Sequence, residues 1–97
     1  MKQYKITENN ITYDITKHPN GDKYWYKNGK YHRENGPAVI LTDLHKAWYK
    51  NGLLHRSNGP AVEYVSGSKE YWYNGKRLNN IKSDEDLKRY IKLLSIS

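Results

Sequence analysis

Residues 23–40 read KYWYKNGKYHRENGPAVI, and this stretch decides the fold because the chain repeats it. It returns as KAWYKNGLLHRSNGPAVEY over residues 46–64, and its first half returns as KEYWYNGKR over residues 69–77. Adding 23 to a residue number carries each copy onto the next without an insertion or a gap. A unit this short cannot bury its own apolar face, so successive units must stack. The repeat predicts a mainly β fold, an antiparallel meander of stacked 23-residue hairpins, and favours a binding surface over an enclosed active site.

Two turn signals occur in the repeated unit. Asn-Gly between short aromatic runs predicts a type I′ hairpin turn, because both central residues of that turn have positive φ. We expect hairpin tips at Asn28-Gly29, Asn51-Gly52 and Asn74-Gly75. The second signal adds a proline, which fixes φ and removes a backbone donor before the next strand. It stands at Gly36-Pro37 and Gly59-Pro60.

The chain is interpreted as a single domain over residues 1–97, with three segments. Residues 1–22 predict an N-terminal hairpin around Asn9-Asn10, residues 23–78 hold the repeats, and residues 83–95 predict a helix. We expect nine or ten strands in the sheet. The helical segment begins at a good N-cap, Ser83, and its apolar residues follow the spacing of one helix face. We expect this helix to cover the incomplete last unit and cap an open sheet edge, with contact to a partner or a membrane as the alternative.

Composition and charge limit the possible function classes. The chain has no Cys, which excludes disulfides, thiolate metal sites and a cysteine nucleophile. No segment has the length and apolar character of a leader peptide or a membrane span, so we expect a cytoplasmic protein without a cofactor or bound metal. The net charge is +7, and the acids and bases of residues 83–97 cancel, so the excess lies in residues 1–82. Such an excess attracts anionic partners without identifying them.

The repeated pattern W-Y-K-N-G-x-x-H-R-x-x-G-P-A-V resembles MORN repeats, and in particular the MORN-like variants common in proteins of bacteriophages and large DNA viruses. In those units an aromatic residue closely precedes Asn-Gly, and a His lies four residues after the Asn. Over residues 22–78 the aromatic positions are Tyr26, Tyr49 and Trp72, and the His positions are His32 and His55.

The chain also departs from the MORN pattern. Arg33 and Arg56 stand where typical units have Gly, Gly-Pro-Ala replaces the usual glycine pattern, and the third unit has Leu78 and Asn79 in place of His-Arg. The resemblance implies a fold of stacked hairpins. It implies no single function, because such families include scaffolds, membrane-proximal modules, antitoxin-like proteins and viral accessory factors.

The pairs His32-Arg33 and His55-Arg56 are the candidate catalytic groups, because His is the acid-base residue of neutral pH and Arg binds phosphates. Identical residues at equivalent places in successive units more simply have one structural role, such as hydrogen-bonding a turn of the same or a neighbouring unit. No Ser-His-Asp set, carboxylate pair or metal-ligand spacing accompanies them. We therefore assign both pairs, like the turn residues, to the scaffold and expect no enzymatic activity. A hydrolase that uses either His is a third hypothesis.

Lysines form the candidate binding surface. Equivalent residues of stacked hairpins lie two strands apart, a distance of about 9–10 Å. We therefore expect Lys23, Lys46 and Lys69 to form a line of roughly 20 Å across the sheet. Side-chain alternation predicts that five further residues share this face: Lys27, Lys50, Trp25, Trp48 and Tyr71. Bases interleaved with aromatics suit nucleic acid, but a lysine face that only keeps the sheet soluble has the same sequence. The opposite face is expected to hold Tyr24, Tyr26, Ala47, Tyr49, Glu70 and Trp72, and it becomes the candidate if the helix covers the Trp25 side.

Our leading hypothesis is a non-enzymatic binding protein, phage- or virus-encoded, whose repeat sheet docks on a host protein such as a defence-system or toxin component and inhibits or adapts it. The alternative is a protein that binds nucleic acid or an anionic nucleotide through the basic and aromatic rows. Residues that vary between copies are where we expect a partner's contacts. They are Tyr24/Ala47/Glu70, Lys30/Leu53/Lys76 and Glu34/Ser57, together with Arg77.

Overall fold

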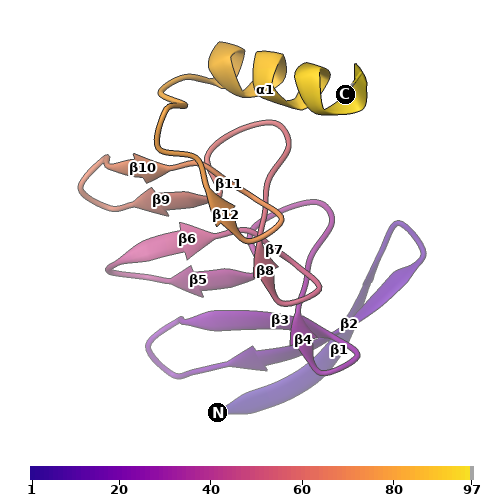
Figure 1. The fold of residues 1–97 in the computed structure, drawn as a ribbon. Helices are drawn as coiled ribbons and strands as arrows, with labels where there is room; N and C mark the ends of the chain where they lie inside the picture. The colour runs from indigo at the N-terminus through magenta and orange to yellow at the C-terminus, as the bar shows by residue number, and fades with distance from the viewer. Residues whose placement is uncertain (97) are drawn as a thin grey trace.

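The computed structural model describes residues 1–96 as an antiparallel β structure followed by one helix (Figure 1). The elements are β1 (Lys2–Glu8), β2 (Ile11–Lys17), β3 (Lys23–Lys27), β4 (Lys30–Tyr31), β5 (Val39–Leu41), β6 (His45–Ala47), β7 (Tyr49–Lys50), β8 (Leu53–Leu54), β9 (Val62–Tyr64), β10 (Lys69–Glu70), β11 (Trp72–Tyr73), β12 (Lys76–Arg77) and α1 (Asp84–Ile96). The main sheet has the order β1-β2-β3-β5-β6-β9-β10, with β4 paired to β3. The predicted antiparallel meander and C-terminal helix are confirmed, but there are twelve strands rather than the nine or ten expected.

The extra strands arise because the hairpin tips leave the main sheet. β7 and β8 form a separate two-stranded sheet, and so do β11 and β12. Each tip instead bonds to the tip hairpin of the preceding unit, where Gly52 N–H donates to Tyr31 O at 2.9 Å and Gly75 N–H donates to Leu54 O at 2.8 Å. The tips therefore stack along one side of the main sheet, as Figure 1 shows for β4, β7–β8 and β11–β12.

The Asn-Gly pairs form the predicted tight turns. Asn28, Asn51 and Asn74 have φ of 52°, 50° and 49°, and the glycines that follow them have φ of 77°, 81° and 82°. Positive φ at both central residues is the signature of a type I′ turn, whose twist matches that of the flanking strands. The Asn9-Asn10 pair also has positive φ at both residues and closes the β1–β2 hairpin.

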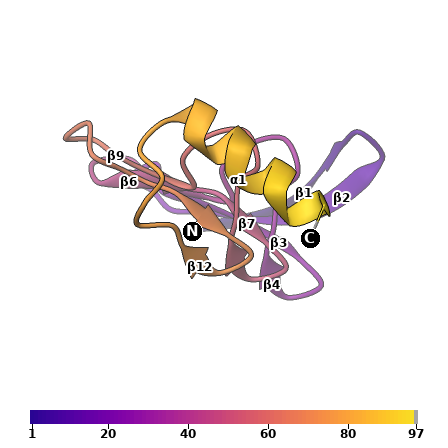
Figure 2. The ribbon, with the colours of Figure 1, turned by 45° about the horizontal axis from the view of Figure 1, so that its top comes forward.

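The helix covers the third unit at the end of the stack, as predicted (Figure 2). Leu87 of α1 packs with Tyr71 and Leu78, and all three are buried. Ser83 is the N-cap, since its hydroxyl accepts the N–H of Asp86 at 3.1 Å. Leu78 occupies the repeat position that is His in the earlier units, because an apolar helix lies beside it instead of another polar hairpin tip.

Aliphatic and aromatic side chains line the opposite face of the main sheet, as expected. Tyr24, Val39, Ala47 and Val62 stand opposite one another on successive strands. Partly buried rings pack around them, among them Tyr31, Tyr49 and Trp72. The stack is elongated, with a radius of gyration of 14.2 Å, compared with about 12.5 Å for a compact chain of this length.

Candidate binding surface

A row of lysines crosses the main sheet on one face. The register places Lys2 opposite Lys17 and Lys17 opposite Lys23. The row continues through Ile40, Lys46, Glu63 and Lys69. We call this set the lysine row. Its six strand steps span about 29 Å at the usual strand spacing.

The predicted alignment of Lys23, Lys46 and Lys69 is confirmed, and the structure adds Lys2 and Lys17 to it. Sequence reasoning missed these two, although the signal was present. A two-residue turn at Asn9-Asn10 pairs Glu8 with Ile11, and counting back along both strands pairs Lys2 with Lys17.

The aromatic side chains between the lysines are largely covered, which disfavours the base-stacking alternative. Trp25 is 2 % exposed and Tyr71 is 8 % exposed, while Trp48 is half-buried. The guanidinium carbon of Arg33 lies 3.6 Å from the centre of the Trp25 ring and covers it. Burial and a hydrogen bond from its hydroxyl to Asp84 raise the pKa of Tyr71 to about 12, because both disfavour the phenolate.

Lys27, Lys50 and Arg77 do not extend the lysine row as a single surface. Lys27 pairs with Lys30 beside the first hairpin tip. Lys50 lies in β7, outside the main sheet, so the alternation that would place it beside Lys46 is broken at Trp48. Arg77 is exposed in β12, with a guanidinium nitrogen 3.7 Å from a carboxylate oxygen of Glu70.

The two repeat histidines hold the next hairpin tip, as the structural interpretation predicts. His32 Nδ1 accepts the N–H of Asn51 at 2.9 Å, and His55 Nδ1 accepts the N–H of Asn74 at 2.9 Å. Burial, followed by the positive charge of Lys50, lowers the pKa of His55 below its ordinary value of 6.5. The neutral form is the one that can accept at Nδ1, so this direction agrees with the hydrogen bond.

The arginines that follow these histidines clamp the Gly-Pro turn of their own unit. Arg56 lies 3.9 Å from the centre of the Trp48 ring and donates to Pro60 O at 3.0 Å. A Cβ atom on Gly59 would meet the Arg56 guanidinium carbon at 2.9 Å. The same contact joins Gly36 to Arg33, so the repeated Arg and Gly are explained together by close packing.

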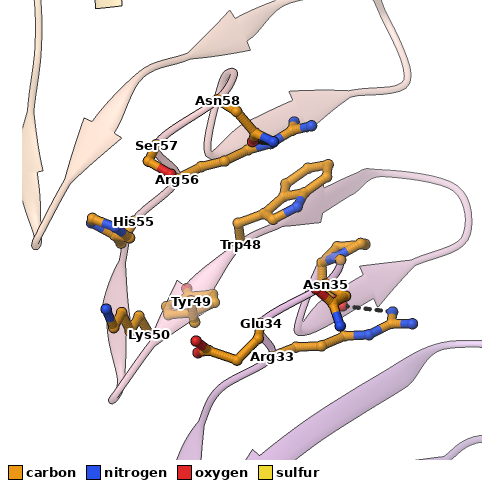
Figure 3. Close-up of a pocket in the computed structure, with 12 residues that line it drawn as sticks. Arg33, Glu34, Asn35, Trp48, Tyr49, Lys50, His55, Arg56, Ser57 and Asn58 are labelled. Atoms are coloured by element: carbon orange, nitrogen blue, oxygen red, sulfur yellow. Dashed lines mark hydrogen bonds between the residues drawn. The ribbon is translucent and has the colours of Figure 1, made fainter. Parts of the chain in front are cut away.

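A cleft of about 520 Å³ opens between the loops of the first and second units (Figure 3). Its lining comes from residues 33–37 of the first unit and from residues 48–50 and 55–58 of the second. Trp48 and Tyr49 lie in the middle of the lining, and Lys50 and His55 lie together at one end (Figure 3). We call this the inter-unit cleft. Sequence reasoning did not predict it, although it singled out Glu34 and Ser57 as varying between copies.

Within residues 1–96, no group of three or more His, Cys, Asp or Glu side chains could hold a metal ion. No helix in this part of the chain is long and apolar enough to cross a membrane. Comparison of the chain with protein-family models, with curated proteins and with solved structures finds no match.

Proposed function

We propose that this chain is a non-enzymatic binding protein that docks its lysine row on an acidic surface of a host protein, which it inhibits or adapts. One observation carries the proposal: Lys2, Lys17 and Lys23 stand directly opposite one another on adjacent strands. Like charges at opposite positions destabilise a sheet. A face that only had to be soluble could alternate its charges, as Lys46 and Glu63 do. A partner with negative charge along the row offsets the repulsion.

A protein partner accounts for the surface better than nucleic acid does. Nucleic-acid surfaces of this kind stack bases on exposed aromatic rings, whereas Trp25 and Tyr71 are buried. Binding of nucleic acid or an anionic nucleotide is the second candidate, favoured by the length and positive charge of the row.

The source and target in this proposal rest on the sequence resemblance of residues 22–78 to MORN-like repeats of phage and viral proteins. On the basis of this resemblance, we propose that the protein is encoded by a phage or virus and acts in the host cytoplasm. The proposed host target is a component of a defence system or a toxin.

Charge reversal of the lysine row tests the proposal. The tagged chain and its Lys23→Glu/Lys46→Glu/Lys69→Glu variant are used to capture proteins from host lysate at low salt. The matched control reverses the same number of charges at exposed lysines outside the sheet: Lys82→Glu/Lys88→Glu/Lys92→Glu. We expect a stoichiometric protein on the wild-type and control chains that is absent from the row variant.

Two outcomes contradict this proposal. Equal capture by the row variant shows that the lysine row is not the docking surface. Capture that disappears after nuclease treatment, with an affinity that falls steeply with salt, supports the nucleic-acid candidate instead.

A further inference from the structure

The two edges of the main sheet differ in length and cover. β10 forms one edge with only two residues, and α1 packs on the third unit beside it. β1 forms the other edge with seven residues, Lys2–Glu8. Within the described part of the chain, β1 pairs only with β2, and it contains neither a proline nor a break in the register. Proteins usually protect a long edge strand with such features, so β1 is open to a further strand.

The β1–β2 register determines which backbone groups of β1 are unpaired. Because the turn at Asn9-Asn10 has two residues, the pair that flanks it is hydrogen-bonded, and hydrogen-bonded pairs then alternate along the antiparallel ladder. The even-numbered residues of β1 therefore bond to β2. The N–H and C=O groups of Gln3, Lys5 and Thr7 point away from β2, and all three residues are exposed. They offer a row of donors and acceptors to a neighbouring strand.

The tip of the β1–β2 hairpin reaches beyond the rest of the sheet (Figure 1 and Figure 2). β3 pairs with β2 over residues 14–17 only, so within residues 1–96 the part of the hairpin nearest its tip has no third strand. Two-stranded ribbons are at best marginally stable on their own. A strand added along β1 would support this projecting part.

A second copy of β1 fits this edge in one antiparallel register. Placing Lys5 opposite Lys5 of the second copy aligns all seven residues, and Gln3 then meets Thr7, so the outward backbone groups face each other. A shift by one residue would oppose outward groups to groups already bonded to β2, and a shift by two would leave part of the strand unpaired. A two-fold axis perpendicular to the sheet relates the copies, and such a contact closes at a dimer.

The charges of this register are complementary on the face of the lysine row. Lys2 stands opposite Glu8 of the second copy. Among the described residues, no carboxylate lies within ion-pair distance of Lys2, whose neighbour on β2 is Lys17. Hydrogen bonds from the Arg33 guanidinium hold the pKa of Glu8 below its ordinary value, which keeps the carboxylate ionised. Each Glu8 oxygen accepts one of these bonds and can accept another from Lys2.

The apolar side chains of β1 also match in this register. Tyr4 stands opposite Ile6 of the second copy, in a non-hydrogen-bonded pair, where side chains approach most closely. Tyr4 is 37 % exposed, and Ile6 packs against the buried cluster that contains Tyr13, Ile15 and Trp25. Pairs of an aromatic and a β-branched residue stabilise neighbouring strands. The dimer would therefore extend this cluster from one copy into the other.

Lysines on an edge strand usually discourage pairing, but Lys5 is compensated within its own chain. Its Nζ lies 2.5 Å from a carboxylate oxygen of Asp14, which stands directly opposite it on β2. Each copy thus brings an ion pair to the two-fold axis instead of a free charge. Both side chains are exposed, so the remaining repulsion is screened by salt.

From these features we propose that β1 pairs with β1 of a second copy and forms a two-fold dimer with one continuous antiparallel sheet. The inference goes beyond the proposed function and does not depend on it. Because the axis is perpendicular to the sheet, the lysine rows of both copies lie on the same face. A partner with acidic surfaces that reach both rows gains affinity from the two contacts together.

Removing one outward N–H tests the pairing. Gln3→Pro deletes a donor that the dimer uses, whereas the β1–β2 ladder uses neither backbone group of Gln3 and stays intact. Gln3→Val is the matched control, because it removes the same side chain and keeps the N–H. In sedimentation equilibrium, the wild type and Gln3→Val should approach twice the monomer mass of 11.5 kDa as the concentration rises. Gln3→Pro should raise the dimer dissociation constant by about tenfold or more.

Disulfide cross-linking tests the register, since the chain has no Cys of its own. Lys5→Cys places a thiol opposite its own copy with about 5.5 Å between the Cα atoms, within reach of a disulfide. Thr7→Cys is the matched control, because the two Thr7 positions of the dimer are four residues apart along the strands, about 14 Å. With oxidised glutathione, Lys5→Cys should form linked dimers about tenfold or more faster than Thr7→Cys.

Three results would overturn the inference: a wild type that stays monomeric to near-millimolar concentration, equal dimerisation of Gln3→Pro and Gln3→Val, or equal cross-linking of the two cysteine variants. Circular dichroism verifies that each variant is folded, and the cysteine pair decides the matter if Gln3→Pro is not. A monomeric wild type whose capture of a lysate protein is lost in Gln3→Pro would assign the edge to a strand of that protein.

Failure of the proposed function is distinguishable from failure of the dimer. The Lys23→Glu/Lys46→Glu/Lys69→Glu variant leaves β1 unchanged and should still dimerise. If neither the wild type nor this variant captures a protein but both dimerise, the proposed function fails and the β1 pairing stands.

Discussion

Gly59 lies against the guanidinium group of Arg56, and this contact makes a prediction at the scale of single residues. Its φ is not in the left-handed region, so the backbone accepts alanine, but the added Cβ would meet Arg56 at 2.9 Å. Arg56 would then leave the Trp48 ring, and we expect Gly59→Ala to cost about 1–2 kcal/mol. In an Arg56→Ala background the clash is absent, and the same change should be neutral or stabilise by about 0.5 kcal/mol.

Urea unfolding of the four proteins in this double-mutant cycle measures the coupling between Gly59 and Arg56. Gly36→Ala is expected to cost more than Gly59→Ala, because Arg33 donates two hydrogen bonds to Glu8, whereas Arg56 donates one to Glu63. Equal costs of Gly59→Ala with and without Arg56 would show that the glycine is needed for some other reason.

His55 makes the folded state sensitive to pH. Its pKa is lowered from the ordinary value of 6.5, so the unfolded chain binds the proton more readily than the folded one. The resulting stability is present above pH 6.5 and is lost as the pH falls toward the lowered folded value. In His55→Asn, an amide oxygen can accept the Asn74 N–H without titrating. We expect the dependence of the unfolding free energy on pH to flatten just below 6.5 in this variant.

Urea unfolding from about pH 8 to about pH 5, across the range in which His titrates, measures this slope. Carboxylates with lowered pKa values, such as Glu8 and Glu70, lose their contribution only around and below their ordinary value of 4.5. An unchanged slope in His55→Asn would assign the pH dependence to other groups.

At the scale of elements, α1 closes the stack through one buried side chain. Leu87 is 1 % exposed and packs on Tyr71 and Leu78. Leu87→Ala should cost about 2–5 kcal/mol, because it removes apolar contacts and leaves a cavity. Leu93 in the same helix is 62 % exposed, and Leu93→Ala should change stability by less than about 0.5 kcal/mol.

Thermal melts of both variants, with helix content followed by circular dichroism, check this prediction. If Leu87→Ala and Leu93→Ala cost the same, the helix does not stabilise the third unit. The helix was predictable from its apolar spacing and its N-cap because those signals are local. Its position over the third unit also followed from the sequence, since that unit is incomplete and has Leu78 where the others have His.

At the scale of the whole molecule, the order of the strands in the stack could be predicted from the sequence. The position of the hairpin tips beside the main sheet and the burial of its aromatic residues could not. Asn-Gly turns and the fixed period predict which strands are neighbours, and hence the lysine row. The departure of the tips from the main sheet depends on bonds such as Gly52 N–H to Tyr31 O, which join separate units. The burial of Trp25 likewise depends on Arg33 folding back over it. Such tertiary contacts leave no local pattern, so the sequence left open whether the aromatic side chains between the lysines are exposed.

The lysine row gives the free molecule a stability that depends on salt. Lys17 stands opposite both Lys2 and Lys23, and opposed like charges each cost about 0.2–1 kcal/mol. Raising the ionic strength from about 0.01 M to about 0.15 M shortens the screening length from about 30 to about 8 Å. The melting temperature should therefore rise with salt. Lys17→Glu should raise it at low salt and flatten its rise, whereas Lys82→Glu should have a smaller effect.

Melting temperatures of the wild type, Lys17→Glu and Lys82→Glu across the salt series test this prediction. Destabilisation by Lys17→Glu at low salt would show that the opposed lysines do not repel each other. The same variant separates stability from binding. An acidic partner relieves the repulsion from outside, as the introduced carboxylate does from within the chain, so Lys17→Glu should stabilise the free chain and weaken capture of the partner. A row needed only for solubility predicts greater stability with no change in capture.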